Sequence, residues 1–97
     1  MSSKQSNVAA VSRFALHDNW ISSVAWSPSN ENMVATTGYD GQVKIVDLRA
    51  KTALHVIKDA MGGQSGDKVF CCDWNGDFVF YGGEGKDLHV ISVKNFE

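Results

Sequence analysis

Two stretches of this chain can be laid over each other, and this internal copy constrains the fold more than any other feature of the sequence. "WISSVAW" at residues 20–26 aligns with "KVFCCDW" at 68–74, and "TTGYDGQVKIVDL" at 36–48 aligns with "YGGEGKDLHVISV" at 81–93. The offset changes from 48 to 45 residues between the two pairs, and the difference lies in the turn after the tryptophan. A unit of roughly 45 residues whose length varies only in a loop is typical of stacked repeats, each packed on its neighbours.

The copied unit consists of short segments in which apolar and polar residues alternate. Eight such segments, separated by Gly, Asn, Asp and Ser, occupy residues 11–17, 20–26, 33–38, 42–48, 53–59, 67–74, 77–83 and 87–93. Strands of this length with such turns predict an all-β fold, and the internal copy favours a propeller over a sandwich. The glycine-rich residues 58–67 are predicted to be a loop, because each Gly in a helix costs about 1 kcal/mol.

Composition and charge narrow the class of protein. The chain is 43% hydrophobic and 21% charged, as a folded domain is. Its net charge of −2 and the absence of a basic cluster argue against direct binding to nucleic acid. No apolar run approaches the roughly 20 residues of a membrane span. We therefore expect neither a membrane nor a nucleic acid as a direct partner.

The two cysteines, Cys71 and Cys72, are neighbours in the sequence. Adjacent side chains on a strand point to opposite faces, so a disulfide between them is not expected. They also lack the spacing of a zinc site. The sequence therefore favours a reducing, intracellular compartment, and it predicts no metal or other cofactor.

Residues 17–48, "HDNWISSVAWSPSNENMVATTGYDGQVKIVDL", resemble a WD repeat. The resemblance implies a structural hydrogen-bond network of His17, Thr36 and Asp40, and it places Val46 where the family has tryptophan. The chemistry is reasonable in itself, because a buried carboxylate needs hydrogen bonds and a histidine and turn amides can donate them. The Asp40-Gly41 pair also suits a tight turn between strands.

The second copy lacks this network. Ser65, Tyr81, Gly85 and Ile91 occupy the four corresponding positions. Its apolar pattern is intact, so we expect a folded but degenerate blade.

The resemblance implies a partial β-propeller, with two four-stranded antiparallel blades over residues 11–95. Residues 11–52 would be the first repeat and 53–95 the second, after a flexible segment at 1–10. In this family each repeat begins with the outer strand of the preceding blade, so we expect the last blade to lack its outer strand. Remaining blades or other copies would then be needed to close the propeller, and the isolated chain is predicted to associate or aggregate.

The C-terminal part is similar to the end of the YTM-type ribosome-biogenesis WD-repeat proteins. The similarity lies in "DKVF" at residues 67–70, in Trp74, in the Gly82-Gly83 pair and in Lys86. It implies a non-catalytic protein-interaction scaffold for large-subunit assembly in the nucleus and nucleolus. The implied partners are pescadillo and a second WD-repeat protein, with pre-ribosomal particles contacted indirectly.

Three residues are candidates for partner binding. Tyr39 lies at the tip of a turn, where an aromatic residue can anchor an interface. Trp20 either faces a loop surface or packs between blades. Arg49 ends "VDLR", which resembles the Asp-x-Arg ending of WD-repeat substrate receptors of cullin-RING ubiquitin ligases, and this is the alternative function.

An enzyme is not predicted. His17 and Asp40 form a conceivable catalytic dyad, but the sequence shows no nucleophile at a comparable position, so a structural role is favoured.

Overall fold

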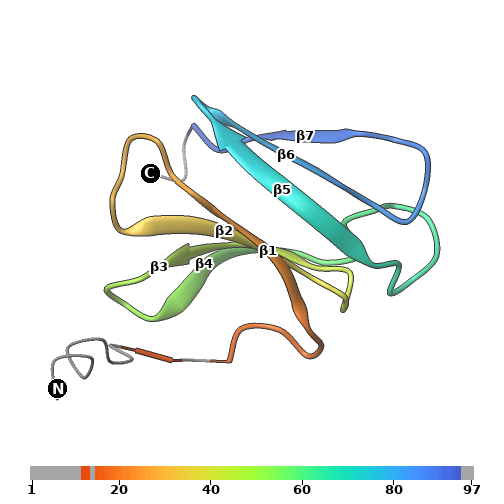
Figure 1. The fold of residues 1–97 in the computed structure, drawn as a ribbon, viewed down its shortest axis with the longest axis horizontal. Coiled ribbons are helices and arrows are strands. Elements are labelled where there is room, and N and C mark those ends of the chain that lie inside the picture. Colours follow the sequence, from red (N-terminus) through yellow and green to blue (C-terminus); the bar gives the residue numbers. More distant parts are fainter. Residues whose placement is uncertain (1–11, 14, 95–97) are drawn as a thin grey trace, which may run out of the picture.

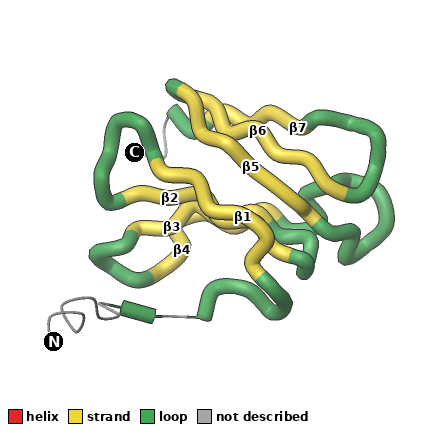
Figure 2. The backbone as a smooth tube through the Cα atoms, in the orientation of Figure 1, coloured by secondary structure: helices red, strands yellow, loops and turns green. Residues whose placement is uncertain are grey.

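The computed structural model describes residues 12, 13 and 15–94, and these form two antiparallel sheets (Figure 1, Figure 2). The first sheet has the order β1 (Ile21–Trp26), β2 (Met33–Gly38), β3 (Val43–Asp47) and β4 (Thr52–Ile57). The second has the order β5 (Val69–Asn75), β6 (Phe78–Gly83) and β7 (His89–Ser92). The described residues contain no helix, and residues 58–68 form a loop. The prediction of an all-β fold is confirmed.

The two sheets pack face to face, with β5 against β1 and β2. Alternate residues of each strand enter the space between the sheets, as the pleat of a strand requires. The main core comprises Ala25, Met33, Ala35 and Ile45 from the first sheet and Trp74, Val79 and Val93 from the second half of the chain. One face of each sheet is therefore covered by the other sheet, as in a stack of repeats.

A second apolar cluster closes the end of the structure where the long loop runs. It contains Val43, Ala60, Met61, Val69 and Tyr81. The amide of Ala60 donates to the carbonyl of Gly41 at 2.8 Å, and the hydroxyl of Tyr81 donates to the carbonyl of Ala60 at 2.9 Å. The loop is thus hydrogen-bonded to both sheets.

A break in the pairing of β1 with β2 joins the two sheets directly. The register shifts between Ile21 and Ser23, so Ser22 is an extra residue in β1. Its hydroxyl donates to the carbonyl of Val69 on β5 at 2.6 Å and lies 2.8 Å from Thr37 Oγ1. A β-bulge commonly redirects a side chain in this way.

The strand predicted at residues 11–17 is wrong for the residues that the structure describes there. Instead of pairing, this segment contacts the end of the first sheet through its last two residues. The Leu16 carbonyl accepts a hydrogen bond from Lys44 Nζ, and the His17 ring bonds to two side chains of the sheet. The flexible segment predicted at residues 1–10 lies outside the described residues.

Among the described residues the second sheet has three strands, as expected for a last blade that lacks its outer strand. β4 lies in the second sequence repeat but pairs with β3 of the first sheet. The strand order expected from the offset between repeat and blade is therefore present in the first sheet.

Candidate functional site

The structure brings together the three residues predicted to form a hydrogen-bond network. The Nδ1 atom of His17 lies 3.0 and 3.1 Å from the two carboxylate oxygens of Asp40, and Nε2 lies 2.8 Å from Thr36 Oγ1. The histidine comes from the segment before β1, the threonine from β2 and the aspartate from the turn after β2. The network therefore ties that preceding segment to the β2–β3 end of the sheet.

Backbone amides complete the environment of Asp40. The amide of Asp18 donates to Oδ2 at 2.9 Å, and the amide of Gln42 donates to Oδ1 at 3.1 Å. Burial alone would raise the pKa of Asp40, but the hydrogen bonds from Asp18, His17 and Gln42 together lower it below the ordinary value of 3.8. Because the ionised carboxylate only accepts hydrogen bonds, His17 donates through Nδ1.

Gly38 is a part of this site that the sequence analysis missed. A methyl carbon added there would lie 2.6 Å from His17 Nδ1 and 2.7 Å from Asp40 Oδ1. Both distances are shorter than van der Waals contact, so any larger residue would push the imidazole away from the carboxylate. The signal was available in the sequence as the Gly that ends β2, two residues before the aspartate.

The contacts Thr36–His17–Asp40 follow the order hydroxyl, imidazole and carboxylate, which is also the order in a hydrolase triad. Thr36 is 2% exposed and the His17 side chain is fully buried, so neither side chain is open to solvent. The contacts are those of a network that holds backbone segments together.

At the corresponding place, the second sheet uses other residues for a similar purpose. Tyr81, which aligns with Thr36, bonds to the carbonyl of Ala60 in the loop that leads into this sheet. Glu84 Oε1 accepts a hydrogen bond from the amide of Lys68 at 2.8 Å, much as Asp40 accepts one from Asp18. A side chain near the turn therefore holds the preceding segment in both sheets.

Trp20 and Tyr39, both predicted to contact partners, lie next to each other, and Tyr39 also lies next to a third aromatic residue, Phe70. The ring centroids of Trp20 and Tyr39 are 6.0 Å apart, and those of Tyr39 and Phe70 are 5.8 Å apart with the edge of one ring toward the other. Trp20 is 74% exposed and Phe70 is 46% exposed. We call these three residues the aromatic rim; it crosses from the first sheet to β5.

Arg49, the third predicted contact, lies apart from the aromatic rim. It follows β3 in the turn before β4, at the other end of the first sheet. Its backbone amide donates to Asp47 Oδ1 at 2.9 Å, and its guanidinium Nε lies 3.7 Å from the same oxygen. The guanidinium is largely exposed.

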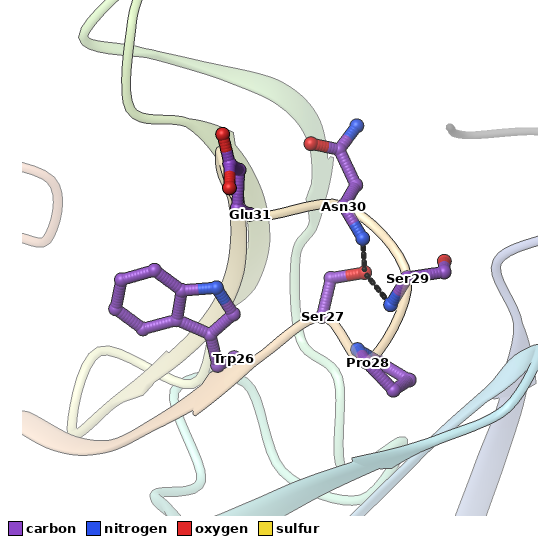
Figure 3. A pocket seen from close by; sticks show the side chains of 6 residues that line it. All are labelled: Trp26, Ser27, Pro28, Ser29, Asn30 and Glu31. Atoms are coloured by element: carbon purple, nitrogen blue, oxygen red, sulfur yellow. Dashed lines mark hydrogen bonds between the residues drawn. The ribbon is translucent and has the colours of Figure 1, made fainter.

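The β1–β2 loop forms a shallow hollow of about 620 Å³, lined by Trp26, Ser27, Pro28, Ser29, Asn30 and Glu31 (Figure 3). The buried Ser27 hydroxyl accepts hydrogen bonds from the amides of Ser29 at 3.3 Å and Asn30 at 3.1 Å. The hollow is thus the inside of a hydrogen-bonded turn beside an exposed indole.

Within the part of the chain that the structure describes, no group of three or more His, Cys, Asp or Glu side chains is placed to hold a metal ion. Cys71 and Cys72 are both free. In the same residues, no helix has the length and apolar character needed to cross a membrane.

Comparison with family models finds the WD domain, G-beta repeat, at residues 9–47. Similar curated proteins include a ribosome biogenesis protein WDR12 homolog of Nematostella vectensis, 45% identical over 77% of this chain, and that of Oryza sativa subsp. japonica, 33% identical over 92%. The ribosome biogenesis protein YTM1 of Scheffersomyces stipitis is 33% identical over 81%. The chain spans only 17%, 20% and 18% of these proteins.

Two solved structures have the same fold. The computationally designed Ika4 protein matches 88% of this chain and 48% of its own with a TM-score of 0.66, at 21% identity. The Cps50 (Swd1) β-propeller domain of Myceliophteria thermophila matches 79% of this chain and 23% of its own with a TM-score of 0.62, at 14% identity. The two sheets are therefore arranged as in a β-propeller.

Proposed function

The chain belongs to the WD-repeat family, and from this premise we propose that it is part of a non-catalytic protein-interaction scaffold that acts in ribosome biogenesis. Its relatives are named as ribosome biogenesis proteins, and these names support a role in that process. The buried His17–Asp40 network supports a non-catalytic role, because its polar atoms are engaged in holding the backbone.

One observation carries the scaffold proposal: one face of the first sheet leaves large apolar side chains exposed. Trp26 and Trp74 occupy corresponding positions in the two copies, but Trp74 is 5% exposed and Trp26 is 59% exposed. β1 and β2 cover the face that holds Trp74, whereas the described residues place no second sheet on the face that holds Trp26, and only the segment at Leu16 and His17 contacts part of it. Val24, Leu54 and Val56 are also exposed in the first sheet.

We infer that a further blade covers the Trp26 face, because an exposed apolar patch marks a surface made for contact. The chain spans about a fifth of the length of its curated relatives, so further blades have room in a longer polypeptide. Other copies of this chain are the alternative source. In either case the completed propeller would present loops to its partners.

The finer part of the proposal concerns the complex and its place in the cell. We propose that the parent protein joins pescadillo and a second WD-repeat protein, assists assembly of the large ribosomal subunit and resides in the nucleolus. The C-terminal residues quoted above and the names of the relatives support this reading.

The test is affinity purification of the tagged parent protein from cells, with the bound proteins identified by mass spectrometry. The proposal expects pescadillo, its WD-repeat partner and precursors of the large subunit. A matched purification of the parent protein carrying Asp40→Ala controls for loss of the folded blade. Recovery of neither partner, with the parent protein folded and nuclear, would contradict the ribosome-assembly role.

A second candidate, a ubiquitin-ligase substrate receptor, has one favourable observation. The Arg49 side chain is 71% exposed and is available to an adaptor. Purification of the parent protein with Arg49→Ala tests it: a ligase adaptor that binds the parent protein and is lost from the variant would favour this candidate, and absence of any adaptor would exclude it.

A further inference from the structure

We propose that the aromatic rim binds a cationic side chain, an arginine or a lysine, presented by a basic segment of a partner protein. This inference rests on the proposed scaffold function and names the class of partner that one surface would take. It draws on two independent features of the same end of the molecule, the exposed rings and the excess of carboxylates.

The backbone holds the rings of the aromatic rim near one another, and the outermost ring is open to solvent. Tyr39 lies between Trp20 and Phe70, and its amide donates to the Trp20 carbonyl at 2.9 Å, so the turn is held against the segment before β1. The high exposure of Trp20 leaves the indole able to meet a ligand. Trp is the aromatic side chain that attracts a cation most strongly, through the negative face of its ring system.

The loops around the aromatic rim carry more carboxylates than cations. The ends of the strands gather residues 18–20, 39–42, 58–68 and 84–88 at this end of the two sheets (Figure 1). They contain six carboxylates, on Asp18, Asp40, Asp59, Asp67, Glu84 and Asp87, and three ammonium groups, on Lys58, Lys68 and Lys86. The formal charge of these loops is −3, excluding histidine.

The opposite end of the molecule has no such excess. Its turns and the segment after β7, residues 27–32, 48–51, 76–77 and 93–94, contain Glu31 and Asp77 against Arg49, Lys51 and Lys94, so their formal charge is +1. Trp26 lies at this end and is exposed like Trp20. The molecule therefore supplies its own control: two exposed tryptophans at the two ends of β1, of which only Trp20 has an excess of carboxylates in the loops around it.

The sign of the charge selects the partner. The phosphates of a nucleic acid would be repelled by the excess of carboxylates, and a purely apolar segment would gain nothing from them. A basic segment gains both long-range attraction and a cation–π contact at Trp20.

The experiment uses the 97-residue chain and a blocked heptapeptide, acetyl-Gly-Arg-Gly-Arg-Gly-Arg-Gly-amide. Its control is the same peptide with citrulline in place of arginine, which keeps the length and planar shape of the side chain, removes the charge and replaces one guanidinium nitrogen by a carbonyl oxygen. Isothermal titration calorimetry measures both affinities, and amide chemical shifts locate the site. The proposal expects the arginine peptide to bind at least about fivefold more tightly and to shift the resonances of Trp20 and Tyr39.

Trp20→Ala is expected to weaken binding of the arginine peptide by about fivefold, whereas Trp26→Ala leaves it unchanged. Asp18→Asn combined with Asp87→Asn removes two carboxylates without touching the rings and should also weaken binding. This double variant decides the matter if circular dichroism shows that Trp20→Ala does not fold. Equal binding of both peptides, or equal loss in the two tryptophan variants, would overturn the proposal.

This test is separable from that of the proposed function. Peptide binding at the aromatic rim with no ribosome-assembly partner in the purification would leave a basic-segment site in a scaffold of another process. Recovery of the ribosome-assembly partners with no selective binding at the aromatic rim would leave the proposed function and remove this inference.

Discussion

The two sheets hold their turns by different chemistry. In the first sheet, the Asp40 carboxylate accepts hydrogen bonds from an imidazole and two backbone amides. In the second sheet, the Tyr81 hydroxyl and the Glu84 carboxylate each form a hydrogen bond with the backbone of the preceding loop. Both arrangements tie the segment that leads into the sheet to the end of its second strand.

The difference shows which part of the repeat the fold requires. The apolar alternation is copied in both sheets and fills one shared core, as Ile45 and Val79 show by being fully buried. The polar tie, by which we mean the side-chain hydrogen bonds to the segment that leads into each sheet, only has to pair backbone groups of that segment, and several kinds of side chain can do that. The three motif residues of the first copy, His17, Thr36 and Asp40, are therefore replaceable in the second.

The shared core should matter more than either polar tie. Ile45→Ala removes a fully buried side chain from the contact between the sheets, and we expect it to lower the free energy of unfolding by about 2–5 kcal/mol. Urea denaturation followed by far-ultraviolet circular dichroism measures this loss. A loss of unfolding free energy smaller than that caused by Asp40→Ala would show that the shared core contributes less to stability than the polar hydrogen bonds do.

Asp40→Ala should come next. It leaves the amides of Asp18 and Gln42 and the Nδ1–H of His17 without their acceptor, so we expect a loss of about 1–3 kcal/mol. The same denaturation experiment measures it. Gly38→Ala is the companion variant, because its added carbon separates the same two side chains; an unchanged denaturation midpoint for both variants would show that the network contributes nothing to stability.

Tyr81→Phe should cost less, about 1 kcal/mol, since it removes one hydroxyl and leaves the ring in the core. Its matched variant is Thr36→Val, which removes the corresponding hydroxyl from the first sheet. Similar losses from the two variants would support equivalent roles. A loss from only one of them would mean that the two ties are not equivalent.

The smallest effect should be a dependence on acid. The pKa of Asp40 is lower in the folded chain than its ordinary value of 3.8, so its ionised form stabilises the fold above that pH and this contribution disappears as the pH falls through the folded value. The difference in unfolding free energy between the native chain and Asp40→Asn should therefore shrink below pH 3.8. A constant difference between pH 6 and about pH 3 would count against the lowered pKa.

The fold was largely predictable because the alternation of apolar and polar residues that produces it is local and is repeated along the chain. Alternation assigned the strands from 20 to 93, and the copied tryptophans indicated a repeat. The segment at 11–17 failed because its alternation was real but no described strand pairs with it, and pairing is a long-range property that alternation does not report. The alternating pattern alone does not indicate that this segment forms hydrogen bonds with the end of the first sheet.

The site was predictable where its residues resemble a known motif and not where contacts bridge the two copies. His17, Thr36 and Asp40 follow from the motif. Phe70 joins the aromatic rim, and Ser22 reaches β5, only because the sheets pack in a particular way. Gly38 and the Tyr81–Ala60 bond depend on close approaches that a one-dimensional pattern does not contain.

The unequal exposure of Trp26 and Trp74 has a consequence for how stability grows with the number of sheets. An open row of sheets always has one sheet-to-sheet contact fewer than it has sheets. Two sheets therefore share a single contact, and each of them has one face without a neighbouring sheet. Every added sheet contributes one contact without adding an end, and the sheet that closes the ring contributes two. The largest gain in stability should therefore come from the sheet that closes the ring. A pair of sheets should be near the smallest number that stays folded by itself.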